Sequence, residues 1–144
     1  MPGGGHPLAV AVAHCKSGVG KTTTTIILGR YLARRRRVAL LDYDDGQHLT
    51  ALLKDISPDG VVTNRLWLDE ASGLSEADVV LIDSAPARSR ETRRALVEAD
   101  YVLVPAPPER QVVRSVHHML DTICGTGRVH LLEECGVDRP FLVV

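Results

Sequence analysis

The chain has 144 residues and a mass of 15.6 kDa, and its 17 Lys and Arg against 18 Asp and Glu leave a formal charge of −1. That balance excludes a polybasic nucleic-acid binder recognisable from charge alone. With 44% hydrophobic and 24% charged residues, the composition is typical of a globular domain and not of a disordered chain. We expect one domain over residues 1–144, with an aliphatic core because aromatic residues make up only 3%.

Cysteine usage and the chain ends indicate a cytoplasmic protein. Cys15, Cys124 and Cys135 are odd in number and lack the short repeated spacing of a disulfide framework or a zinc knuckle. The N-terminus has no signal-peptide pattern, and no apolar run approaches the roughly 20 residues that span a bilayer. The last residues, 141–144, have the pattern of a buried strand, so we expect the chain to be incomplete at its C-terminus.

Apolar runs alternate with helical patterns along the chain. The runs expected to be strands are Leu8–Ala13, Val38–Leu41, Val79–Ile82, Tyr101–Val104 and Phe141–Val144. The segments expected to be helices are Thr22–Arg36, Arg90–Glu98 and Arg110–Cys124. This α/β order predicts right-handed crossovers and a parallel sheet covered by helices on both faces. Within residues 50–75 the pattern is uninformative, and an edge strand at Val61–Leu68 is as well supported as a loop.

The first predicted helix has an apolar pattern and a basic end. Its apolar residues at helical spacing are Ile27, Leu28, Tyr31 and Leu32. The run Arg34–Arg37 follows, where cations favour the helix dipole. A second group of arginines follows Asp83, namely Arg88, Arg90, Arg93 and Arg94. For both groups a solvated helix surface is the preferred interpretation over a patch for nucleic acid or a partner.

A glycine-rich loop separates the first predicted strand from the first predicted helix. It runs His14-Cys15-Lys16-Ser17-Gly18-Val19-Gly20-Lys21-Thr22-Thr23. The ending Gly-Lys-Thr, entering a helix straight after an apolar strand, is typical of a phosphate-binding loop, in which backbone amides wrap an oligophosphate. Gly18 and Gly20 allow positive backbone torsions. Lys21 supplies a cation for the β and γ phosphates, and Thr22 a hydroxyl ligand for Mg²⁺.

Carboxylates close two further predicted strands. Asp42 and Asp44 follow the second run, and Asp83 follows the run Val79–Ile82. Because ligands of open parallel sheets bind outside the carboxyl ends of the strands, these side chains should converge on the glycine-rich loop. The strand end gives Asp83 the position of a carboxylate facing the Mg²⁺ shell.

The lysines of the loop carry a family resemblance. Two of the three lysines in the chain, Lys16 and Lys21, lie in it. A second lysine ahead of Gly-x-Gly-Lys-Thr resembles the deviant loop K-G-G-x-G-K-[ST] of the ParA/MinD family of dimeric ATPases, with Ser17 in place of one glycine and Cys15 where the standard pattern has glycine. The segment Asp83-Ser84-Ala85-Pro86 is similar to that family's D-x-x-P, and residues 95–105 to its helix, acidic turn and strand ending in proline.

The segment after the second strand resembles the family's switch motif D-x-D-P-Q-G-N-x-T with departures. This chain continues from Asp44 as Asp45-Gly46-Gln47-His48-Leu49-Thr50. Asp45 replaces the proline, and the glutamine and glycine are transposed.

The resemblance implies a P-loop NTPase-like fold of the SIMIBI type, truncated at the C-terminus, with ATP and Mg²⁺ as cofactors. Nucleotide binding would fall to Lys16, Ser17, Gly18, Val19, Gly20, Lys21, Thr22 and Thr23. Lys16 would be the signature lysine that reaches a phosphate across a dimer interface, and Lys21 and Asp44 would complete the catalytic group, with Asp44 orienting or activating the attacking water. The metal site would comprise Thr22, Asp42 acting through water, and Asp83.

The implied function is Mg²⁺-dependent ATP hydrolysis by a ParA-type dimer switch in plasmid or chromosome partition, or in related DNA transfer and positioning. The implied partners are a second copy of the chain across the nucleotide and a centromere-binding type of protein. DNA binding has no support in the sequence present, since the family's surfaces for DNA or membrane lie in segments that follow. Two alternatives stay open: a non-hydrolysing nucleotide-binding module for dimerisation or regulation, and a biosynthetic relative that uses ATP.

Three weaker candidates have structural interpretations. His117 and His118 are neighbours on a predicted helix, so they point to different faces and no shared metal site is expected. Cys15 is interpreted as a small loop residue in preference to a redox-sensitive thiol. Trp67 is expected to pack against the core.

Overall fold

A computed structural model of the chain describes residues 5–14, 18–44, 46–69, 73–85, 90–111, 114 and 141–143. The strands are β1 (Leu8–Val12), β2 (Val38–Tyr43), β3 (Val61–Thr63), β4 (Leu66–Leu68), β5 (Val79–Ser84), β6 (Tyr101–Val104) and β7 (Phe141–Val143). The helices are α1 (Lys21–Leu32), α2 (His48–Ile56), α3 (Arg90–Glu98) and the short 3₁₀ helix η1 (Gly73–Glu76). The predicted histidine pair, Cys124, Cys135 and most of the predicted helix from Arg110 lie outside the described residues.

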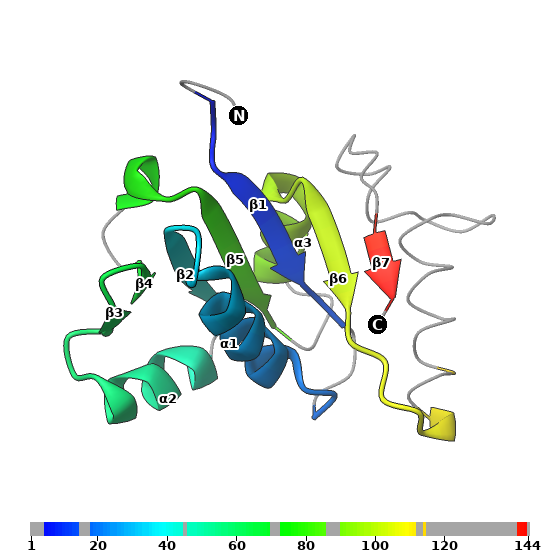
Figure 1. Cartoon of the computed structure of the whole chain (residues 1–144). Coiled ribbons are helices and arrows are strands. Elements are labelled where there is room, and N and C mark those ends of the chain that lie inside the picture. The colour runs from blue at the N-terminus through cyan, green and yellow to red at the C-terminus, as the bar shows by residue number, and fades with distance from the viewer. Residues whose placement is uncertain are drawn as a thin grey trace.

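The strands form one sheet in the order β3-β4-β2-β5-β1-β6-β7 (Figure 1). Every neighbouring pair is parallel except β3 and β4, which are antiparallel. Strands β1 and β5 are flanked on both sides, and β5 is buried along its whole length. This explains why the central strands appear in the sequence as continuous apolar runs.

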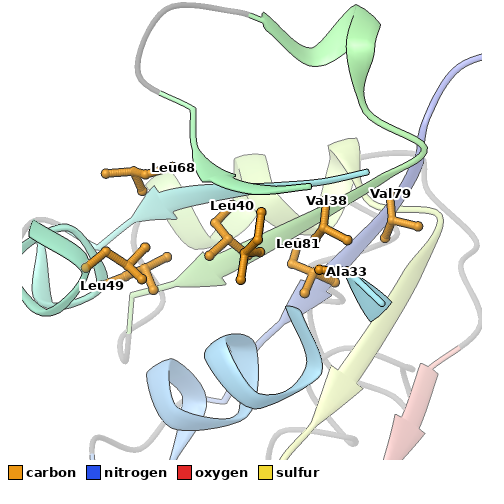
Figure 2. Packing of buried hydrophobic residues seen from close by; sticks show 9 residues of the cluster. Ala33, Val38, Leu40, Leu49, Leu68, Val79 and Leu81 are labelled. Carbon is orange, nitrogen blue, oxygen red and sulfur yellow. The ribbon is translucent and has the colours of Figure 1, made fainter. Parts of the chain in front are cut away.

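Helices cover the two faces of the sheet. Helices α1 and α2 pack over β2, β4 and β5 on one face, in a cluster of buried residues that includes Val38, Leu40 and Leu81 (Figure 2). Helix α3 lies on the other face, where Ala95 and Ala99 join a second cluster. The predicted parallel sheet with helices on both faces is therefore confirmed. No helix in the described part of the chain is long and apolar enough to cross a membrane.

The segment 61–68 forms two short strands and not a single strand, and β3 is the one at the edge of the sheet. Strands β3 and β4 are joined by the turn at residues 64–65, and only β4 continues the parallel sheet by pairing with β2. Trp67 in β4 is half-buried against the α3-side cluster, which confirms its expected packing role.

Helix α1 buries only part of the face that was predicted, because Leu28 and Leu32 pack against the core cluster and the other two predicted residues do not. Ile27 is 64% exposed and Tyr31 65% exposed, whereas Thr25 and Gly29 are buried. A Cβ added at Gly29 would lie 3.2 Å from side-chain atoms of two core leucines, so the helix approaches the sheet closely enough that only small residues fit beneath it. The prediction was wrong for Ile27 and Tyr31 because apolar spacing alone does not reveal which stripe of a helix must be small.

The helix also ends earlier than expected. Helix α1 stops at Leu32 and has its C-cap at Ala33, so Arg34–Arg37 lie in the following turn and are exposed. Arg37 pairs with Asp78 at 3.5 Å. The solvated position of these arginines agrees with the preferred interpretation.

Candidate phosphate-binding site

The glycine-rich loop leads from β1 into α1. Gly18 has φ +72° and Gly20 φ +90°, which confirms the expected positive torsions. Gly20 is the N-cap of α1, and Lys21 is the first helical residue. The first turn of α1 contains no acidic side chain, so no carboxylate of that turn would compete with an anion for its backbone amides. Cys15, Lys16 and Ser17 lie outside the described residues.

The loop and the segment after β2 line an open cavity of about 360 Å³. Its lining residues are Gly18, Gly20, Lys21, Thr22, Thr23, Asp44 and His48. Val19 is buried and contributes to the core instead. The structure thus brings residues from two separate strand ends together, as the parallel topology requires.

Asp83, near the end of β5, does not line the cavity but contacts Thr22, which does. It is 1% exposed, and Thr22 Oγ1 donates a hydrogen bond of 2.6 Å to its Oδ2. Its Oδ1 has no hydrogen-bond partner within the described residues. Burial raises the pKa of Asp83 to about 6, since the hydrogen bond from Thr22 only partly offsets it. A buried carboxylate oxygen without a donor has the character of a cation ligand.

Asp42 and Asp83 occupy paired positions on neighbouring strands, β2 and β5. The two carboxylates are engaged differently. Asp42 Oδ2 accepts hydrogen bonds from the backbone amide of Thr50 at 2.8 Å and from its hydroxyl at 2.6 Å. Its Oδ1 accepts one from the amide of Asp44 at 3.1 Å. Asp42 therefore anchors the first turn of α2, and its contact with Mg²⁺ through water stays a prediction.

Asp44 is held by a residue that the sequence did not single out. Nδ1 of His48 lies 2.8 Å from Asp44 Oδ2, and the amide of Gly46 donates to Asp44 Oδ1 at 3.1 Å. The hydrogen bond and negative charge of Asp44 raise the pKa of His48 above its usual value of 6.5. The available signal was the i, i+4 spacing of the two residues at the start of a helix.

The donor set fits magnesium bound together with a phosphate. Among the described residues no three His, Cys, Asp or Glu side chains are grouped so as to hold a metal ion by themselves. Mg²⁺ keeps several waters and is bound through one or two protein oxygens plus substrate phosphates. The adjacent oxygens of Thr22 and Asp83 suit that mode, because one oxygen of the buried carboxylate has no donor among the residues that the structure describes.

In this parallel sheet, a glycine-rich loop leads from β1 into the N-terminus of α1, and the neighbouring strand β5 carries the carboxylate of Asp83. This arrangement defines a P-loop nucleotide-binding protein. Residues 10–130 match the family described as the CobQ/CobB/MinD/ParA nucleotide binding domain. The chain belongs to this family, which confirms the resemblance seen in its loop and strand ends.

Curated relatives of the chain are partition and positioning proteins. It is 34% identical over 116 residues to maintenance of carboxysome distribution protein A from Gloeobacter kilaueensis, covering 74% of this chain and 52% of that protein. It is 30% identical over 147 residues to protein ParA from Rhizobium radiobacter, covering 92% of this chain and 60% of that protein. It is 31% identical over 150 residues to the chromosome-partitioning ATPase Soj from Thermus thermophilus, covering 79% and 60%. The chain thus spans between half and three-fifths of these relatives' lengths.

Solved structures share the fold. A complex of ATP with a single-residue variant of Cyanothece McdA matches with a TM-score of 0.78 at 23% identity, over 98% of this chain and 70% of that one. A plasmid partition protein from Borrelia burgdorferi bound to AMPPNP matches with a TM-score of 0.75 at 20% identity, over 96% and 75%.

Proposed function

We propose that this chain binds Mg²⁺-ATP in the cavity beside Gly18–Thr23 and hydrolyses it, as a ParA-type dimer switch in partition or positioning of DNA or another cargo. The single observation that carries the proposal is the convergence of Lys21, Thr22, Asp44 and Asp83 from three separate parts of the chain. A glycine-rich loop alone is a weak signal. The loop together with a buried strand-end carboxylate hydrogen-bonded to its threonine is a much more specific one.

Each residue has a task that its surroundings suit. The amides at the start of α1 and the Lys21 ammonium would bind the phosphates, where a buried cation is attracted more strongly than in water. Thr22 and Asp83 would hold Mg²⁺, whose charge stabilises the negative oxygens of the transferred phosphoryl group. Asp44 would orient the attacking water and accept its proton. Lys16 would add charge from a second copy of the chain.

Turnover and binding should be measured separately on the same preparations. We expect Mg²⁺-dependent release of phosphate from ATP, lost in Lys21→Ala and in Asp44→Ala. Nucleotide affinity should fall in Lys21→Ala but remain in Asp44→Ala. Lys54→Ala is the matched control, because Lys54 is exposed on α2 and does not line the cavity. Turnover that survives both cavity substitutions would refute the assignment.

Dimerisation needs its own assay. We expect sedimentation velocity to show an ATP-dependent dimer that Lys16→Ala weakens without unfolding the monomer. Unchanged dimerisation in that variant would remove the role of the signature lysine.

The non-hydrolysing module is the second candidate. It is favoured by the fact that both carboxylate oxygens of Asp44 already accept or share hydrogen bonds within the chain, from Gly46 and with His48. Tight ATP binding with no phosphate release would support this candidate over the ATPase.

A further inference from the structure

The imidazole of His48 lies against Gly46 at the wall of the cavity. A Cβ built on Gly46 would be 2.8 Å from Cε1 of the ring and 3.1 Å from Nδ1, and its three nearest contacts are all atoms of this ring. The backbone of Gly46 is outside the left-handed region, so a larger residue there would meet no torsional obstacle. What glycine provides at this position is room for the ring.

The next residue adopts a conformation that glycine would adopt more easily. Gln47 has φ 49° and ψ 40°, and it is the one non-glycine residue with positive φ in the described part of the chain. In the family's switch motif D-x-D-P-Q-G-N-x-T, glycine stands at the position of Gln47 and asparagine at the position of His48. In this chain the glycine is Gly46, one residue earlier, where the His48 ring needs space. Gln47 therefore has to adopt the left-handed backbone conformation without being a glycine.

We propose that His48 is a positioning residue for Asp44, and that Gly46 and His48 form a unit in which the small residue lets the imidazole reach the carboxylate. The Nδ1–H group donates to Asp44 Oδ2 and fixes the orientation of a side chain that is only 13% exposed, while the imidazole itself is 74% exposed. This inference rests on the proposed function, since the residue positioned is the one that would act on the attacking water.

The charge state of His48 then affects what Asp44 can do. Carboxylates face the imidazole from Asp44 itself, from Asp42 on β2 and from Asp83 on β5, and Lys21 lines the same cavity. A protonated imidazole draws the negative charge of Asp44 toward itself and makes that carboxylate a weaker proton acceptor. A neutral imidazole keeps the hydrogen bond without the charge. Turnover should therefore rise with pH as His48 loses its proton.

The first test needs no nucleotide. The Cε1–H resonance of His48, assigned by its absence in His48→Asn, is titrated by NMR in the wild-type chain, Asp44→Asn and Gly46→Ala. We expect the pKa of His48 to lie above 6.5 in the wild type and to fall toward 6.5 in both variants, because an alanine at 46 pushes the ring off Asp44. A pKa that Gly46→Ala leaves unchanged would overturn the inference.

The second test measures kcat and KM for Mg²⁺-ATP across pH. His48→Ala and Gly46→Ala should lower kcat about tenfold with little change in KM. His48→Asn, which supplies a neutral donor, should restore part of this loss and abolish the rise of kcat with pH. A His48→Ala variant with the wild-type kcat would overturn the inference while leaving the ATPase in place. A wild-type chain without any turnover would overturn the proposed function, and the NMR titration would still decide whether Gly46, His48 and Asp44 act as a unit.

Discussion

Replacing Asp83 by asparagine should stabilise the nucleotide-free protein at neutral pH and should weaken the proposed binding of Mg²⁺. The carboxylate is 1% exposed and its pKa is raised from 3.8 to about 6, chiefly by burial. The pKa of Asp83 is higher in the folded state than in the unfolded state, so between these two pKa values the folded state binds more protons. The free energy of unfolding therefore falls as the pH rises through this range. The stabilising effect of the proton is complete below about pH 4 and is lost above about pH 7. A rise of this size corresponds to about 3 kcal/mol.

Urea unfolding of the wild type and Asp83→Asn from about pH 4 to about pH 8 measures this difference. Asparagine keeps an oxygen for the Thr22 hydroxyl and carries no charge, so the difference in unfolding free energy between the variant and the wild type should grow by about 3 kcal/mol from below about pH 4 to above about pH 7. Mg²⁺-ATP should raise the melting temperature of the wild type and have much less effect on Asp83→Asn. A gap that does not grow with pH would refute the account of Asp83 as a buried charge that its neighbours only partly compensate.

Three further substitutions test other contacts. Gly29→Val should cost about 2 kcal/mol in urea unfolding, because the added methyl groups enter the contact between α1 and the core leucines; an unchanged midpoint would contradict that close approach. Gln47→Gly should raise the unfolding free energy by up to about 1 kcal/mol by relieving the left-handed backbone, and a loss of stability would argue against strain. Tyr43 donates to Glu98, and burial together with that carboxylate raises the pKa of Tyr43 to about 12. The difference in ultraviolet absorbance between the wild type and Tyr43→Phe should therefore appear only near pH 12, and a titration at the ordinary value of 10.0 would exclude the contact.

The parts of the fold that the sequence predicted are those whose cause is local. Strands β1, β2, β5 and β6 are buried between neighbours, so each is a continuous apolar run that needs no knowledge of its partners to recognise. The loop from Gly18 to Thr23 is equally local, because its torsions follow from its own glycines. The meeting of Asp83 with Thr22 followed from the single premise that the sheet is parallel.

The parts that were missed depend on contacts between distant segments. Gln47 provides no side-chain cap for helix α2. A backbone amide of its first turn, that of Thr50, is instead hydrogen-bonded by Asp42 on β2, so the residues just before the helix carry no capping pattern that would predict its start. The buried face of α1 depends on how near the helix comes to the sheet at Gly29. The pairing of His48 with Asp44 requires the chain to turn at Gln47, a turn whose backbone the amino-acid type does not favour.

The two hydrogen bonds that Thr50 donates to Asp42 attach the first turn of α2 to the end of β2. Helix α2 has its start attached to a strand end eight residues earlier, so it cannot shift its first turn independently of β2. Pulling the carboxylate away leaves both donors of Thr50 without their acceptor, which costs about 1–3 kcal/mol. As long as these two hydrogen bonds hold, a displacement of the Asp42 end of β2 carries the first turn of α2 with it.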